Sequence, residues 1–175
     1  MRGGSFSAAA FAFLVAGAVW AIASPWWTLR EMRAAAAARD PAALAAHVDF
    51  PALRESLKSE LAAAMLAEAA AQPDGAAALG AALGVAMIDP LVDGLVSPAG
   101  LRMMFAAEPA RGGAAPLGGF GAEGELAIDR DGFSTFRVAR RDAPAEAALV
   151  FRRDGYAWKL AGVELPEAGL ELAAR

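Results

Sequence analysis

Residues 131–164, DGFSTFRVARRDAPAEAALVFRRDGYAWKLAGVE, decide the fold of this chain. Runs rich in Phe, Val, Leu and Trp, which favour strands, alternate there with turn signals. Asp131-Gly132 and Asp154-Gly155 stand between neighbouring runs, and glycine tolerates the positive φ of a tight hairpin. Together with the run before them, these predict strands over residues 125–129, 133–141, 147–153 and 156–164. We therefore expect an antiparallel meander of three or four strands.

Upstream of this stretch the sequence predicts helices. Ser-Pro and Asp-Pro dipeptides mark helix starts, because Ser or Asp accepts a hydrogen bond from a free N–H of the first turn and Pro lacks one of those N–H groups. Four such starts are Ser24-Pro25, Asp40-Pro41, Asp89-Pro90 and Ser97-Pro98. A fifth, at Asp49, opens a helix in which Leu53, Leu57, Leu61 and Met65 recur every four residues. We expect this helix to end near Gln72, before Pro73-Asp74-Gly75.

Residues 76–88 read as a helix rich in Ala and Gly. Gly80 and Gly84 either let another backbone approach closely or leave a loosely packed helix of low propensity. The Gly-, Pro- and Ala-rich residues 108–124 predict a loop, and residues 165–175 a C-terminal tail. A helical half over residues 24–107 followed by strands over 125–164 predicts one α+β domain, residues 24–164.

The first 23 residues address the protein to a membrane. Arg2 precedes an uncharged apolar run from Phe6 to Ala23, which ends in an Ala-x-Ala pattern typical of a cleaved secretory signal. The run is also long enough to span a bilayer, and Trp20, Trp26 and Trp27 near its end resemble an interfacial aromatic belt. Residues 1–23 are therefore a signal peptide or an N-terminal inner-membrane anchor. We expect an anchor with the domain in the periplasm, or else secretion to the periplasm.

Composition excludes several function classes. The formal charge of −4 and the pI near 5.0 argue against nucleic acid as a partner. Cysteine is absent, which excludes disulfides and cysteine metal sites. Ala supplies much of the 57% hydrophobic content and removes little surface from water, so Leu, Val, Met and the aromatic residues decide the packing. We expect no cofactor and no metal.

Catalysis has one candidate pair. His47, the only histidine, lies two residues before Asp49, and a His–carboxylate pair orients a base for nucleophilic catalysis. The pair has no evident third member, and Asp49 and Ser97 already serve as expected helix caps. We expect a non-enzymatic protein, with a hydrolase built on His47 and Asp49 as the remote alternative.

Ligand binding has candidates in the predicted sheet. Tyr156, Trp158 and Leu160 fall on one face of the last run, and Lys159 on the other. The aromatic set either lines a pocket or fills the core; it comprises Phe133, Phe136, Phe151, Tyr156 and Trp158. Arginines on adjacent runs either bind an anionic group across a hairpin or protect a solvated sheet edge; they are Arg137, Arg140, Arg141, Arg152 and Arg153. The candidate ligand residues are Trp158, Tyr156, Phe151, Arg140 and Arg152.

Four blocks carry a resemblance to a known family. They are residues 24–27 (SPWW), 48–54 (VDFPALR), 89–98 (DPLVDGLVSP) and 153–160 (RDGYAWKL). The chain resembles the bacterial envelope family catalogued as domain of unknown function 2939, and the second and fourth blocks are the most specific. The resemblance implies a leader-bearing single domain without an assigned activity, so it transfers no functional residue. Helices followed by a curved meander are also similar to the cone-shaped nuclear-transport-factor-2-like and cystatin-like folds.

The expected function is a non-catalytic binding or structural role in the envelope. Its partners would be the inner membrane, through the N-terminal segment, and an envelope protein or an apolar small molecule. The alternative is a carrier of a lipid-like or apolar ligand. A binding domain predicts an exposed apolar patch on the helices, and a carrier predicts an enclosed pocket beside Trp158. A hydrolase predicts a cleft that brings His47 near a serine or a second carboxylate.

Overall fold

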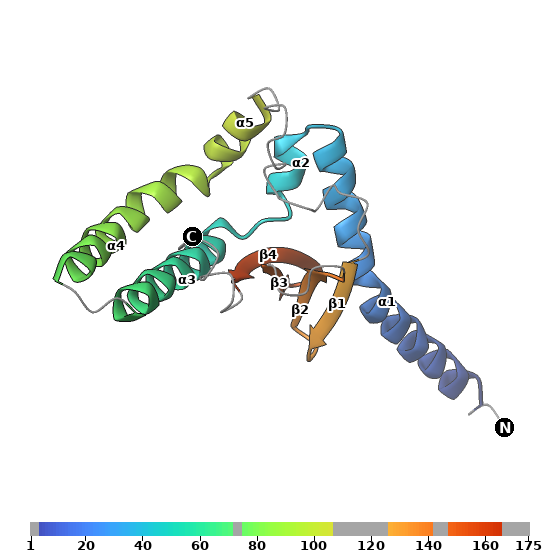
Figure 1. Ribbon diagram of the computed structural model, residues 1–175. Coiled ribbons are helices and arrows are strands. Elements are labelled where there is room, and N and C mark those ends of the chain that lie inside the picture. The colour runs from blue at the N-terminus through green and yellow to red at the C-terminus, as the bar shows by residue number, and fades with distance from the viewer. Residues whose placement is uncertain (1–3, 72–74, 107–125, 142–146, 166–175) are drawn as a thin grey trace.

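The computed structural model of the chain describes residues 4–71, 75–106, 126–141 and 147–165 (Figure 1). Helices come first and a four-stranded sheet follows, so the predicted α+β class is confirmed. The helices are α1 (Gly4–Ala37), α2 (Pro41–Ala45), α3 (Phe50–Ala71), α4 (Gly75–Leu95) and α5 (Pro98–Ala106). The strands are β1 (Leu126–Asp131), β2 (Thr135–Arg140), β3 (Ala148–Asp154) and β4 (Ala157–Glu164). The expected breaker at residues 73–74, the loop at 108–124 and the tail beyond Leu165 lie outside the described residues.

Three of the predicted helix starts are confirmed by their caps. The Asp40 carboxylate accepts hydrogen bonds from the N–H groups of Ala42 and Ala43 at 3.0 Å each, at the start of α2. Asp49 caps α3 and Ser97 caps α5 in the same way, because each side chain accepts the N–H three residues later. Helix α3 also ends at Ala71, next to the predicted end.

The other two predicted starts, Ser24-Pro25 and Asp89-Pro90, are wrong. Pro25 lies inside α1 and Pro90 inside α4. A proline within a helix removes a hydrogen bond and costs about 3 kcal/mol. At residue 25 packing opposes this cost, because Pro25 is fully buried together with neighbouring residues of α1. Asp89 faces a lysine on α3 instead of capping a helix.

The sheet is the predicted antiparallel meander, in the order β1-β2-β3-β4. Gly132 and Gly155 have φ values of +74° and +61° in the two tight turns, as expected for hairpins that begin Asp-Gly. A bulge interrupts the last pair, since Phe151 pairs with Leu160 while Val150 pairs with Gly162. The predicted alternation is wrong at Tyr156, which lies in the turn before β4 and is exposed.

The core lies between the sheet and the inner half of α1, residues 24–37. Leu29 and Met32 of α1 are buried against Phe136, Phe151 and Trp158. The rings of Phe136 and Phe151 are stacked with centroids 4.7 Å apart, and Trp158 meets Phe136 edge-on at 4.9 Å. The indole Nε1 of Trp158 donates a buried hydrogen bond of 2.8 Å to the Ser24 hydroxyl, which ties β4 to α1. Leu44 of α2 and Leu101 of α5 complete the core from the helical side.

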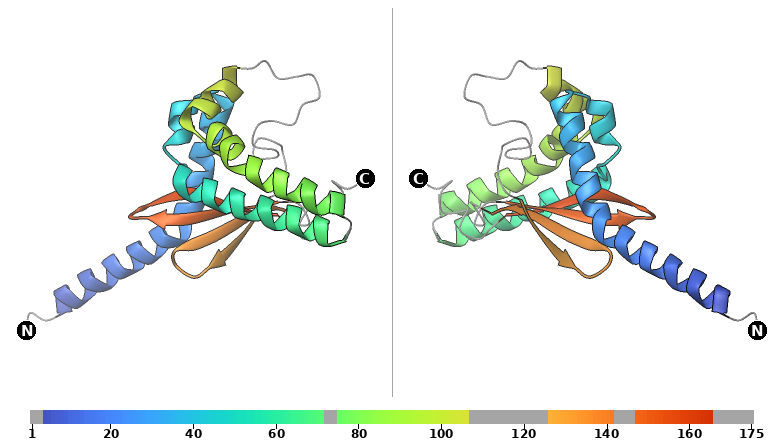
Figure 2. Two further views of the ribbon diagram at one scale, coloured as in Figure 1. Left: turned by 90° about the vertical axis from the view of Figure 1, so that its left-hand side faces the viewer. Right: turned by 90° about the vertical axis from the view of Figure 1, so that its right-hand side faces the viewer.

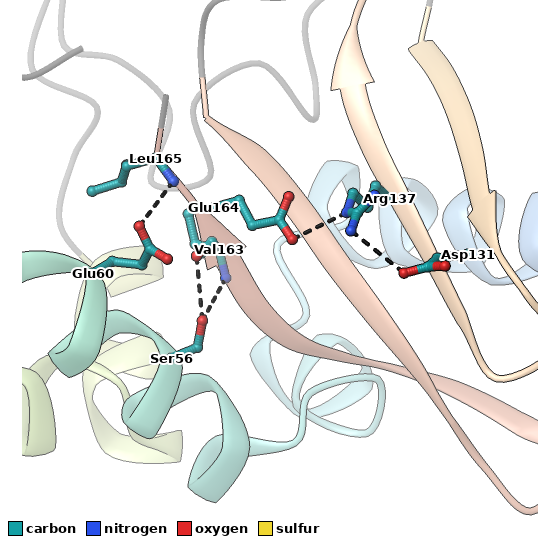
Figure 3. A network of polar contacts seen from close by, with 7 residues as sticks. All are labelled: Ser56, Glu60, Asp131, Arg137, Val163, Glu164 and Leu165. Atoms are coloured by element: carbon teal, nitrogen blue, oxygen red, sulfur yellow. Dashed lines mark hydrogen bonds and ion pairs between the residues drawn. The ribbon is translucent and has the colours of Figure 1, made fainter. Parts of the chain in front are cut away.

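Residues on both sides of the α3 start cover the free edge of β4. The Leu160 N–H donates to the carbonyl of His47, and the Asp49 N–H donates to the carbonyl of Leu160. Further along, the Ser56 hydroxyl accepts the N–H of Val163 at 3.1 Å and donates to its carbonyl at 3.2 Å (Figure 3). These bonds satisfy backbone groups that an open edge would offer to another chain.

The helices form layers outside this edge. Helix α3 runs along β4, and α4 packs on α3 further from the sheet (Figure 2). A Cβ at Gly84 would come within 2.8 Å of the Met65 sulfur, whereas one at Gly80 would meet nothing within 4 Å. Of the two alternatives left open for these glycines, Gly80 fits the loosely packed helix, and at Gly84 it is a side chain of α3, and not its backbone, that comes close.

Candidate binding surfaces

The aromatic ligand candidates divide between core and surface. Trp158 and Phe151 are buried and in contact with Phe136, so their rings pack against protein. Tyr156 and Phe133, which the sequence grouped with them, are each 87% exposed. The five aromatic residues thus do not line one common wall, and the carrier interpretation receives no support from them.

The register separates the two candidate arginines. Arg152 of β3 pairs with Thr135 of β2, whereas Arg140 pairs with Leu126 of β1 at the other end of the sheet. The expected juxtaposition of guanidinium groups across one hairpin is therefore not formed by this pair. Arg137 of β2 donates hydrogen bonds to Glu164 of β4 and to Asp131 of β1 (Figure 3). These carboxylates, Glu164 first, raise the pKa of Arg137 above its usual value.

His47 and Asp49 lie where the chain crosses from α2 to α3. The Asp49 carboxylate is occupied as the cap of α3, and the backbone groups of both residues bond to Leu160. The second carboxylate near His47 is Glu31 of α1, whose Oε2 lies 3.7 Å from the imidazole Nε2. The other oxygen of Glu31 accepts a 2.6 Å hydrogen bond from Trp27 Nε1. This chain of contacts joins α1 to the α2–α3 connection.

In the described part of the chain, no serine and no metal site complements the His47–Asp49 pair. Ser56, Ser59 and Ser97 use their hydroxyls on backbone groups. The described residues also contain no group of three or more His, Asp or Glu side chains placed to hold a metal ion.

A stripe of large apolar side chains is exposed along α4. We call it the α4 face; its members are Leu79, Leu83, Met87, Leu91 and Leu95, each 55–63% exposed. On the other side of the same helix, Ile88 and Val92 are buried. The sequence contains this four-residue repeat. The same spacing on α3 belongs to residues of which Leu53, Leu57 and Leu61 are half-buried, so the pattern alone does not say which helix is left open.

The charges of α4 are directed at α3. Lys58 of α3 lies 3.0 Å from Asp93 and 3.3 Å from Asp89, and Arg54 lies 3.9 Å from Asp93. The hydrogen bond that Lys58 donates to Asp93 is the main cause that raises the pKa of Lys58, and Asp89 adds to it. These ion pairs neutralise the acidic groups of α4 and leave the α4 face free of charge.

Residues Ala78–Leu95 are long and apolar enough to cross a membrane by length and composition alone. The partner helix α3, however, carries Arg54, Glu55, Lys58, Glu60 and Glu68. Placing the hairpin of α3 and α4 in hydrocarbon would bury these charges, each of which costs several kcal/mol at the bilayer centre. We therefore interpret the α4 face as a surface of the folded body.

A second set of exposed apolar side chains marks the outer half of α1, residues 4–23. Phe11, Val15 and Trp20 are exposed there, and Trp26 and Trp27 follow at the point where the helix enters the body. Helix α1 is continuous through residues 23 and 24, the proposed boundary of the leader. Its outer half projects away from the sheet and the other helices (Figure 1).

Comparison with known proteins yields one match. The model of a family described as protein of unknown function (DUF2939) matches residues 14–104, more than half of the 175 residues. The match contains the first three blocks that carried the resemblance and ends before the sheet, so it does not include the Trp158 block. Neither the search of curated proteins nor that of solved structures found a match.

Proposed function

The chain belongs to the DUF2939 family, and we propose that it is a membrane-anchored, non-catalytic binding protein of the bacterial cell envelope. The proposed binding role rests on the exposure of the α4 face. A monomeric protein rarely leaves a contiguous row of large apolar side chains in water, and such a row is typical of an interaction site.

The anchor is the outer half of α1. Residues 4–23 carry no charge, and a helix of about 20 residues covers the roughly 30 Å of bilayer hydrocarbon. Ser24 and Pro25, which follow directly, belong to the buried core. This favours a retained anchor over a cleaved leader, because the helix that would be cut continues into the body. We place the body in the periplasm, as the secretory character of the leader suggests.

The partner at the α4 face is a protein with an apolar surface of its own. Figures 1 and 2 place α4 on the opposite side of the body from the outer half of α1. The bilayer that holds the anchor is therefore remote from the α4 face and does not cover it.

Cell fractionation tests the location. The full-length chain is expressed in a bacterium, and the intact mass, the fraction and the protease accessibility of the product are determined. We expect full-length protein in the membrane fraction that protease reaches only after the outer membrane is permeabilised. A soluble product beginning at Ser24 would refute the anchor, and protection from protease in permeabilised cells would refute the periplasmic location.

Photocrosslinking in living cells tests the binding role. A photoreactive amino acid replaces Leu83, which is 63% exposed on the α4 face. The matched control replaces Glu55, an exposed residue of α3 outside that face. We expect a discrete protein adduct at position 83 and none at 55, and its loss when Leu79 and Met87 are changed to Ser. Adducts to lipid alone, or equal adducts at both positions, would contradict a protein partner at this face.

A further inference from the structure

Two turns of the sheet lie where α1 leaves the body. The Arg153 N–H donates to the Ser134 carbonyl at 2.8 Å, which places the β1–β2 turn next to the β3–β4 turn at one end of the sheet. Trp158, two residues after the second turn, bonds to Ser24 of α1. The two hairpin ends accordingly flank α1 at the point where its outer half begins (Figure 2).

Each of these turns presents an aromatic residue to solvent. Phe133 follows Gly132 in the first turn and Tyr156 follows Gly155 in the second, and both are 87% exposed. On α1, Trp20, Trp26 and Trp27 are 57–60% exposed at the same end of the body. We call these five residues the aromatic collar. They come from three segments far apart in the sequence, the two turns and the part of α1 where its outer half meets the body.

We propose that the aromatic collar is a lipid-binding surface that seats the body on the headgroup layer of the membrane. The proposal rests on the anchor of the proposed function and adds to it a second contact, made by the sheet. Trp and Tyr combine an apolar ring with a polar group, so they favour the boundary between hydrocarbon and water. The length of α1 places that boundary at the collar, because the helix outside the body is about long enough for one bilayer crossing.

The exposed acids of the two turns, Asp131 and Asp154, pair with basic side chains of the sheet, and the arginines next to the collar suit the same occupant. Arg30 and Arg33 are exposed on the first turns of α1 beyond the collar, and Arg152 is exposed on β3 beside the turns. Guanidinium groups at this depth would meet lipid phosphates, which they bind well. Phosphatidylglycerol, an anionic phospholipid, is therefore the ligand class that we expect to strengthen the contact. This role for Tyr156 and Arg152, two of the candidate ligand residues, does not require a pocket.

Spin labelling of single cysteines tests the collar. The chain contains no cysteine, so Phe133→Cys and Tyr156→Cys each give one labelled site in the otherwise unchanged full-length protein. The variants are reconstituted in vesicles of phosphatidylethanolamine and phosphatidylglycerol. Collisions of the label with oxygen, which concentrates in lipid, are compared with collisions with a water-soluble nickel complex. Phe11→Cys is the control for the anchor and Glu55→Cys the control for the water-exposed body. Circular dichroism verifies that each variant is folded.

The proposal expects labels at 133 and 156 to report a depth between those at 11 and 55. Labels at 133 and 156 that behave like the one at 55, with position 11 in the bilayer, would refute the collar and leave the anchor intact. A label at position 11 that is itself in water would refute the anchor and the collar together. Shielding of 133 and 156 from both reagents would indicate a protein contact and overturn lipid as the occupant.

Discussion

At the scale of single residues, the buried hydrogen bond from Trp158 Nε1 to Ser24 Oγ joins the last strand to the first helix. We predict that Ser24→Ala lowers the free energy of unfolding by about 1–3 kcal/mol, because the indole N–H stays buried without its acceptor. Urea unfolding of the full-length protein in detergent measures the change. Ser59→Ala, which removes an exposed hydroxyl from α3, is the control and should have little effect. Equal stability of the two variants would contradict the role assigned to Ser24.

Lys58 gives a pH-dependent prediction at the same scale. Its pKa in the folded protein is raised above the ordinary value of 10.5, chiefly by the hydrogen bond with Asp93. A raised pKa means that Lys58 contributes stability fully below the unfolded pKa and loses that contribution as pH rises through the folded pKa. The difference in urea midpoint between the wild type and Lys58→Met should therefore be largest at neutral pH and shrink above pH 10.5. Asp93→Asn should reduce the difference at neutral pH, and a difference that grows with pH would contradict the ion pair.

Residue patterns predicted the local bonds and missed the distant ones. Asp40, Asp49 and Ser97 cap helices as expected, because a cap involves only the next few residues. Ser24 and Asp89 carry the same signal, but their partners lie on β4 and α3. No local pattern contains those partners, and tertiary packing overrides the helix-start signal at both places.

At the scale of elements, the contact between α3 and β4 depends on the absence of a side chain at Gly162. A Cβ there would lie 2.7 Å from the Ser56 hydroxyl, which holds both backbone groups of Val163. We predict that Gly162→Ala destabilises the protein by about 1–3 kcal/mol through overpacking, with faster hydrogen exchange at the Val163 amide. Gly80→Ala is the matched control, since its Cβ meets nothing within 4 Å; in a helix it should stabilise by about 0.4–1 kcal/mol. A Gly80→Ala protein that is less stable than the Gly162→Ala protein would contradict this packing.

The order and type of the elements followed from the sequence, but their exposed faces did not. Strand alternation and the two Asp-Gly turns gave the meander, and the caps gave three helix starts. The repeat of Leu and Met on α4 predicts one apolar side of a helix, and burial of Ile88 and Val92 on another side leaves that repeat in solvent. Which side of a nearly uniform apolar helix meets α3 depends on Gly84 and the Lys58 ion pairs, and these act between elements.

At the scale of the whole molecule, the two apolar surfaces lie at opposite ends of the body, the aromatic collar beside the exit of α1 and the α4 face beyond α3 (Figure 1). The sequence could not predict this separation, because the collar joins residues 20–27 with Phe133 and Tyr156 only through the sheet register and the bond to Ser24. An anchored body of this shape would present the α4 face away from its own membrane.

This arrangement predicts that the outer half of α1 targets the protein to the membrane and makes no specific contact with the body. Residues 4–19 are replaced by an unrelated uncharged apolar helix of the same length, and Trp20 onward is kept. Because Phe11 and Val15 are exposed and Ser24 is the first residue of α1 whose side chain is described as buried, the free energy of unfolding should change by no more than about 0.5 kcal/mol. The chimera should stay in the membrane fraction and keep the photoadduct at position 83. Loss of the adduct with stability and location unchanged would mean that the outer half of α1 takes part in partner binding itself.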